Sequence, residues 1–185
     1  MEKNDNKIIK IIGPIKGYKS FNLDKTNCYG KRFVDGFKYH CNGDIKFGPH
    51  GNGFHFAKNL EDTIRYSGNP GIGAVRDVLI ASVIASGEIV EGFDDYNGYY
   101  EMFSCSDIKI VKFLTRNEIL EYALSLPELR MARFVSLFRL NSTEIDLFRN
   151  KSYMVDNAIK YYQNENTNIE KVLTKKVSFC DIEKK

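Results

Sequence analysis

All three histidines of the chain lie between residues 40 and 55, and a cysteine stands beside the first of them. His40, Cys41, His50 and His55 are residue types that bind zinc through imidazole and thiolate groups. Adjacent residues such as His40 and Cys41 point to opposite faces of a strand, however, and the sequence contains no CxxC or HxxxH pair. We therefore expect no metal site, and we interpret His40 and His50 as exposed turn residues and His55 as a strand residue.

Motifs for nucleophilic catalysis and phosphate binding are also incomplete. The sequence contains no GxSxG motif, and its cysteines have no reactive signature around them. The glycine-rich segment at residues 68–73 reads GNPGIG, but Ala74 and Val75 follow where a P-loop needs Lys and then Ser or Thr. We interpret this segment as a surface loop, and the adjacent acids Asp94 and Asp95 as part of a turn.

The stretch from Gly51 to Ser67 reads GNGFHFAKNLEDTIRYS and has a more informative order. A short strand bounded by glycine is followed at once by a helix that Asn59 opens. A long apolar strand comes next, reading VLIASVIASGEIVEG, and a further strand-like run then contains Glu101.

This order of elements resembles the core of the ADP-ribosyltransferase fold, found in poly(ADP-ribose) polymerases and related toxins. That family shows a strand reading roughly G-x-G-I-Y-F-A, a helix with a tyrosine near its end, a hydrophobic strand, and a catalytic glutamate that opens another strand. In this chain Gly53 and His55 lie on the glycine strand, with His55 in the place of the tyrosine that stacks on nicotinamide. Tyr66 matches the tyrosine that ends the helix, and Glu101 matches the catalytic glutamate.

A second part of the resemblance lies near the start, where residues 15–18 read IKGY. They resemble the strand in which the family carries His-Gly or Arg-Gly, so Lys16 takes the basic position and Gly17 lets the backbone approach the nicotinamide amide. The resemblance implies NAD as the cofactor and Glu101 as the catalytic carboxylate, which would stabilise an oxocarbenium-like transition state as nicotinamide leaves. It assigns NAD binding to Lys16, Gly17, Gly53, His55 and Tyr66.

The chain departs from that family at Lys16 and His55, and no E-x-E or Q-x-E pair precedes Glu101, which argues against arginine-directed transfer. The resemblance is closer to an uncharacterised domain that recurs in proteins of phages and large DNA viruses. Its motifs YKGF, a turn with Cys and Gly, NGFHF and I-K-I-V match residues 18–21, 28–30, 52–56 and 108–111. We expect a degenerate cleft related to NAD binding that serves as a binding or interaction module; an active NAD-dependent ADP-ribosyltransferase is the alternative, so whether the protein is an enzyme stays open.

Charge says little about partners. Twenty-seven Lys and Arg residues against 24 Asp and Glu residues give a net charge of +3 at pH 7. Acidic and basic residues are interleaved almost everywhere, except in the lysine-rich end of the chain. The net charge of +3 and the lysine-rich end of the chain make a weakly basic nucleic-acid-binding protein the third candidate. An unidentified protein or a nucleotide is the expected partner, and the oligomeric state is left open.

Composition places the chain among globular proteins, with 43% hydrophobic and 28% charged residues. The longest apolar stretch, residues 78–90, is interrupted by polar residues and falls short of the ~20 residues that a membrane span needs. The first residues lack the apolar core and cleavage site of a signal peptide. Four scattered cysteines do not make a disulfide scaffold. We expect an intracellular, cytoplasmic protein in a reducing compartment, with no membrane partner.

The character of the sequence changes near Thr115. Before it, glycine is frequent and short apolar runs predict strands; after it, glycine is absent and apolar residues recur at helical spacing. Helices are predicted at 119–124, 127–138, 143–148 and 153–162, capped at Thr115 or Asn117 and at Ser142 or Thr143. The prediction is an α+β fold with a mixed, split β-sheet resembling ADP-ribosyltransferases. It divides the chain into that module at residues 1–115, a helical cap at 116–165 packed on the sheet, and a polar tail at 166–185.

Four apolar residues of the helical segment have two interpretations. Phe134, Leu137, Phe138 and Leu140 are expected to be core residues that cover one face of the sheet. The alternative is a surface that binds a partner or a second copy of the chain.

Overall fold

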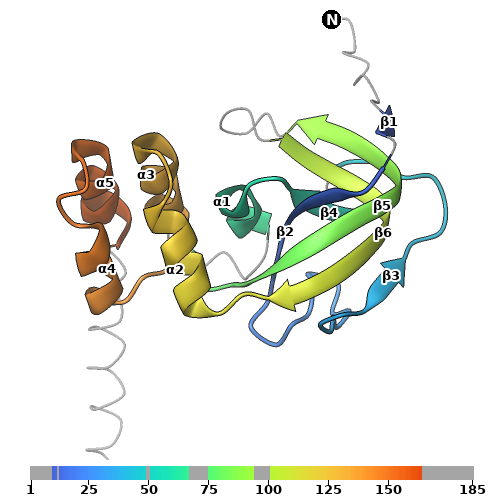
Figure 1. The fold of residues 1–185 in the computed structure, drawn as a ribbon, viewed down its shortest axis with the longest axis horizontal. Helices are drawn as coiled ribbons and strands as arrows, with labels where there is room; N and C mark the ends of the chain where they lie inside the picture. Colours follow the sequence, from blue (N-terminus) through green and yellow to red (C-terminus); the bar gives the residue numbers. More distant parts are fainter. Residues whose placement is uncertain (1–9, 12, 49–50, 67–74, 94–100, 164–185) are drawn as a thin grey trace, which may run out of the picture. The chain divides into compact units, whose positions relative to one another are not determined.

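The computed structural model describes residues 10–11, 13–48, 51–66, 75–93 and 101–163 (Figure 1). The loop at 68–73, the acids Asp94 and Asp95, His50 and the tail at 166–185 lie outside these ranges, and of Glu101 only the backbone is described. The chain forms two compact units, Met1–Gly68 with Val78–Ile119 and Asn69–Asp77 with Leu120–Lys185. The protein is an α+β protein, as predicted.

The first unit contains a six-stranded sheet in the order β1-β5-β2-β4-β6-β3. Its strands are β1 (Lys10–Ile11), β2 (Ile15–Phe21), β3 (Lys38–His40), β4 (Phe54–Ala57), β5 (Leu79–Phe93) and β6 (Glu101–Phe113). β5 also pairs with β6, so β5, β2, β4 and β6 form a closed sheet (Figure 1). Among the described strands, β1 and β3 are the edges of the sheet, and both are short.

The predicted mixed sheet is wrong, because every pairing between these strands is antiparallel. The long strands show the physical reason. Residues 94–100 alone join β5 to β6, and a parallel crossover needs about a dozen residues or more. The two strands therefore pair as a hairpin, and each then pairs with an earlier strand, β5 with β2 and β6 with β4.

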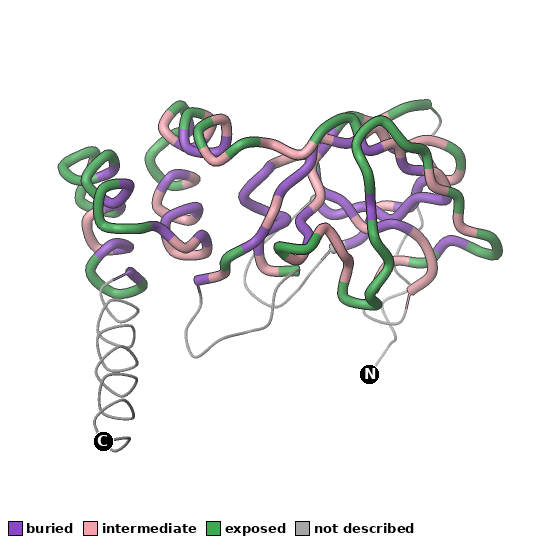
Figure 2. Tube along the Cα trace, turned by 90° about the horizontal axis from the view of Figure 1, so that it is seen from below, coloured by how far each residue is buried: buried purple, intermediate pink, exposed green. Residues whose placement is uncertain are grey.

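The inner face of the closed sheet holds an aromatic core. Alternate residues of each strand point inward, since side chains change face with a period of two. In Figure 2 the buried parts of the trace follow the strands of this unit. The Phe56 and Phe103 rings stack at 5.3 Å between their centroids, and Phe21 packs against Phe33 at 5.0 Å. The core cluster comprises Phe21, Phe33, Phe54, Phe56, Ala81, Val83, Ala85, Ile89, Phe103, Cys105, Ile108 and Ile110.

Helix α1 (Leu60–Thr63) continues into the 3₁₀ turn η1 (Ile64–Tyr66) and packs against β2 and β4. The Ser20 hydroxyl of β2 donates to the Thr63 carbonyl at 2.5 Å. Asn59 occupies the N-cap position as predicted, but its amide donates to the Asp62 carboxylate at 2.9 Å instead of capping the backbone. The helix therefore covers this part of the outer face of β2 and β4.

The second unit is helical, and the predicted helices there are confirmed. α3 (Glu128–Leu137), α4 (Ser142–Phe148) and α5 (Tyr153–Ala158), with the π-helical turn η2 (Ile159–Gln163), follow α2 (Arg116–Leu124), which spans the unit boundary. The start of α2 has Thr115 as its cap, since its hydroxyl accepts from the Glu118 N–H at 3.3 Å. The cap of α4 is Asn141, which forms a capping box with Glu144, so the predicted caps Ser142 and Thr143 are wrong.

Contacts within the helical unit account for its buried aromatic residues. Phe134 lies 4.9 Å from Phe138 and 6.0 Å from Phe148, centroid to centroid. The buried Gln163 amide donates to the Phe138 carbonyl at 2.9 Å and accepts from the Leu140 N–H at 3.3 Å. Phe134, Phe138 and Leu140 are thus core residues of this unit, while Leu137 is half-buried. In the described part of the chain, no helix combines the length and apolar character needed to cross a membrane.

Candidate functional site

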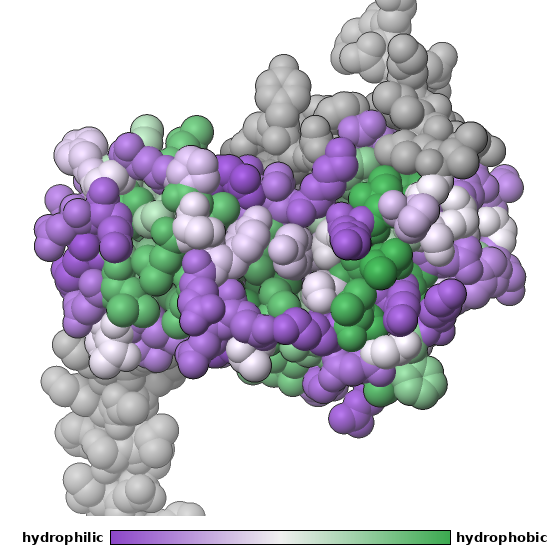
Figure 3. Space-filling view, in the orientation of Figure 1, coloured by the Kyte–Doolittle hydropathy of each residue, from purple (hydrophilic) through white to green (hydrophobic). Residues whose placement is uncertain are grey.

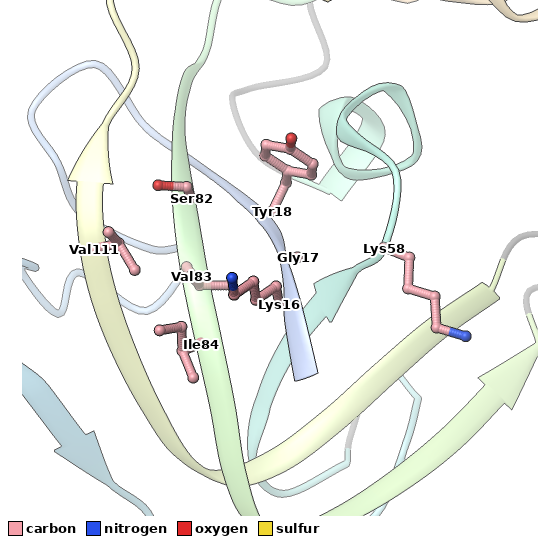
Figure 4. A pocket seen from close by; sticks show the side chains of 8 residues that line it. All are labelled: Lys16, Gly17, Tyr18, Lys58, Ser82, Val83, Ile84 and Val111. Atoms are coloured by element: carbon pink, nitrogen blue, oxygen red, sulfur yellow. The ribbon is translucent and has the colours of Figure 1, made fainter. Parts of the chain in front are cut away.

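A pocket of about 450 Å³ opens on the outer face of the closed sheet (Figure 4). β2 supplies Lys16 and Tyr18, and β5 supplies Ser82 and Ile84. The complete lining is Lys16, Gly17, Tyr18, Lys58, Ser82, Val83, Ile84 and Val111. Figure 4 shows the Lys16 side chain extending across β5 toward Val83 and Ile84, whereas the Lys58 side chain points away from them.

Strand alternation explains this lining. Lys16 and Tyr18 point outward, so Gly17 between them faces the core side. A Cβ atom on Gly17 would lie 2.4 Å from the Ala57 carbonyl oxygen and 2.9 Å from the Phe56 ring. The register between β5 and β6 shifts between Ser82 and Val83, which leaves Val111 unpaired on β6. Glycine at position 17 therefore lets β2 and β4 approach closely, and the bulge brings Val111 to the pocket.

Lys16 is the group in this pocket with free capacity to bind an anion. Its side chain is exposed and has no hydrogen bond or ion pair with any residue in the described ranges. The Lys58 ammonium lies 5.0 Å from the centroid of the Phe103 ring. None of the lining residues is acidic. The pocket thus offers a cation and the Tyr18 ring, with no carboxylate on its described lining.

His55 does not line this pocket. Its ring lies 5.2 Å from that of Phe47, centroid to centroid, and its Nε2 accepts a hydrogen bond from the Gly48 N–H at 3.4 Å. Its carbonyl accepts from the Lys19 ammonium at 2.7 Å, next to the single register pair that joins β2 and β4. Burial and the nearby Lys19 charge lower the pKa of His55 to about 4, and burial lowers the pKa of Lys19 to about 8.

The lowered pKa of His55 makes stability fall on acidification. Below pH 6.5 the unfolded chain binds a proton at His55, while the folded chain stays neutral there until about pH 4. We expect the free energy of unfolding to fall by about 2 kcal/mol between pH 6.5 and 5. Urea denaturation of the parent and of His55→Gln at both pH values measures this loss, which the variant should not show. Equal losses in the two proteins would show that His55 does not cause the loss of stability.

The remaining residues that the resemblance assigned to NAD lie apart from the pocket lining. Gly53 has a φ of +117°, and a Cβ there would meet the Ser104 Oγ at 2.4 Å. Tyr66 ends η1 and is 38% exposed. The Glu101 backbone pairs with that of Phe93 at the start of β6, three residues before Ser104, which is the register partner of His55. The structure thus brings Lys16 and Gly17 together in one pocket, and places Gly53, His55 and Tyr66 outside its lining.

Sequence reasoning missed the rest of the pocket: Tyr18, Lys58, Ser82, Val83, Ile84 and Val111. The alternation of Lys16 and Tyr18 was the available signal for the outward face of β2. The Val111 bulge has no such signal, because it depends on how β6 pairs with β5.

A polar cluster lies on the edge strand β3. His40 Nδ1 lies 2.9 Å from the Asp107 carboxylate, and its Nε2 lies 3.0 Å from the Asn42 side-chain oxygen. His40 is therefore an exposed strand residue and not the predicted turn residue. Hydrogen bonds from Ser106 and from His40 hold the pKa of Asp107 below its usual value. Among the described residues, no three His, Cys, Asp or Glu side chains gather as metal ligands would.

A family model whose description is "Domain of unknown function (DUF7666)" matches residues 15–122, more than half of the chain and all of the strands from β2 to β6. No curated protein and no solved structure matches the chain.

Proposed function

The chain belongs to the DUF7666 family, and on that premise we propose that it is a binding domain whose outer pocket takes a nucleotide, with NAD as the first ligand to test. One observation carries the proposal: the exposed and unpaired Lys16 stands beside the Tyr18 ring in a pocket of about 450 Å³. Lysine binds phosphate as a point charge, and an aromatic ring packs on a base or on nicotinamide. The volume falls in the range of small-molecule sites.

The pocket fits NAD in part. Lys16 and Gly17, to which the resemblance assigns NAD binding, both line it. His55 does not supply the stacking ring, since its own ring packs against Phe47. Tyr18 is the aromatic residue in the lining that could take this role. The proposal is therefore for binding by Lys16 and Tyr18, with no chemical step assigned to the bound nucleotide.

Titration calorimetry with NAD, ADP-ribose and nicotinamide tests this function. We expect NAD and ADP-ribose to bind and nicotinamide alone to bind weakly or not at all, because the phosphates carry the charge that Lys16 meets. Lys16→Gln should weaken binding about tenfold or more, the value of a hydrogen bond to a charged group. Lys46→Gln removes an exposed lysine outside the pocket and should leave the affinity unchanged.

Two results would overturn the binding function. One is the absence of heat with millimolar NAD and ADP-ribose; the other is equal binding by the parent and Lys16→Gln. Incubation with labelled NAD adds a separate readout. If the parent transfers label to protein or nucleic acid and Glu101→Gln does not, the protein is an active ADP-ribosyltransferase and not only a binding module.

A further inference from the structure

Three lysines lie in one row across four neighbouring strands. The register pairs Lys16 of β2 with Ile84 of β5, Ile84 with Lys109 of β6, and Lys109 with Lys38 of β3. Residues paired in this way share a face of the sheet. Because strands lie about 4.8 Å apart, the row spans about 14 Å. Sequence positions 16, 38 and 109 thus form one basic row that no local pattern of the sequence shows.

The row faces outward. Ile84 and Lys16 line the outer pocket. Val83 and Ala85, the neighbours of Ile84 along β5, are buried in the core. Lys16 and Lys38 are exposed, and Lys109 is half-buried. Figure 3 shows hydrophobic side chains gathered over the sheet and bordered by hydrophilic ones.

No salt bridge in the described ranges holds the lysines of this row. Asp107, the acid whose pKa Lys38 helps to lower, already accepts hydrogen bonds from His40 and Ser106. Like charges placed opposite each other on adjacent strands, as Lys38 and Lys109 are, destabilise a sheet. A polyanion laid over the row would relieve that repulsion.

We propose that this outer face binds the phosphate backbone of a single-stranded nucleic acid. The row supplies three cations that can follow successive phosphates, and Tyr18 in the next row supplies a ring for an unpaired base. A base can stack on the Tyr18 ring while the neighbouring phosphates meet the lysines, so the proposal commits to a single-stranded nucleic acid, and an anionic membrane is one outcome of the test. The site goes beyond the nucleotide pocket and shares Lys16 and Tyr18 with it; Lys38 and Lys109 are separate from the pocket.

Fluorescence anisotropy with a labelled oligothymidylate of about 20 nucleotides tests the proposal. Three phosphate contacts predict a slope of about −2 for log K against log salt, or roughly twentyfold weaker binding at 200 mM than at 50 mM salt. The double variant Lys38→Gln with Lys109→Gln should lower that slope to about −0.7 and weaken binding at low salt about tenfold. Tyr18→Ala should weaken binding to the single strand and leave binding to a duplex of equal length unchanged.

A matched double variant, Lys46→Gln with Lys151→Gln, removes the same charge from exposed positions outside the row and should bind as the parent does. Three results would overturn the proposal. The first is no binding of the oligonucleotide by the parent at 50 mM salt, and the second is an equal loss of affinity in the two double variants. The third is that Lys38→Gln/Lys109→Gln loses affinity for vesicles containing anionic lipid but not for the oligonucleotide. Calorimetry with NAD on Lys38→Gln/Lys109→Gln separates the two sites, because that variant keeps every pocket residue. If the parent binds the oligonucleotide but not NAD, the proposed nucleotide function is wrong and the proposal for the basic row stands.

Discussion

Replacing Phe33 by alanine is expected to lower the free energy of unfolding by about 3–5 kcal/mol. Phe33 lies in the connection between β2 and β3, yet it is fully buried. Its ring lies 5.0 Å from Phe21, 4.6 Å from Tyr39 and 6.2 Å from Phe54, centroid to centroid. Three rings from separate strands would lose a partner at once, and the strands cannot close the space. Urea denaturation monitored by far-UV circular dichroism measures the change.

Phe37→Ala is the control for this substitution. Phe37 belongs to the same connection, but it is 61% exposed. Its removal should change the free energy of unfolding by no more than about 0.5 kcal/mol. A loss for Phe33→Ala as small as that for Phe37→Ala would contradict the prediction that the Phe33 ring stabilises the core.

Gly17→Val is expected to be the second large perturbation, with a loss of about 3 kcal/mol. Its Cβ would meet the Ala57 carbonyl oxygen at 2.4 Å, and a backbone atom of a paired strand cannot rotate away. β2 and β4 share a single register pair, Tyr18 with Ala57, so the clash falls where the closed sheet has its narrowest connection. Thermal melting of Gly17→Val shows the loss as a lower Tm.

Lys16→Val places the same branched side chain one residue earlier, at an exposed position of β2. The melting temperature should stay close to that of the parent, because an exposed strand position accepts a branched residue. If Gly17→Val has the same melting temperature as Lys16→Val, β2 and β4 have room to separate, and a glycine is not required at position 17.

Local patterns predicted most elements of the fold. The runs IKGYKSF, GFHF and VLIASVIASGEIVEG predicted β2, β4 and β5, and apolar residues at helical spacing predicted the helices from α2 to α5. Each of these patterns is contained within its own element. The α4 cap was missed for a simple reason: Asn141, Ser142 and Thr143 are all good capping residues, and only the backbone geometry selects among them.

Long-range pairing could not be read from the sequence. The antiparallel closure of the sheet depends on β2 meeting both β5 and β4, and the edge strand β3 has too few residues for a pattern. The pocket and the basic row depend on the same pairing of strands. Lys16 and Gly17 follow one another and were found by resemblance, but Lys38 and Lys109 join Lys16 only through the registers of three strand pairs.

The closed sheet also dictates an order of events during synthesis. β2, completed at Phe21, pairs along its whole length with β5, whose residues begin at Leu79. Ribosomes extend a chain by about 5–20 residues per second, so several seconds pass between the synthesis of β2 and that of β5. β5 and β6 are close in sequence and can form their hairpin first. A chain that stops before Leu79 therefore lacks the template on which its first strands assemble.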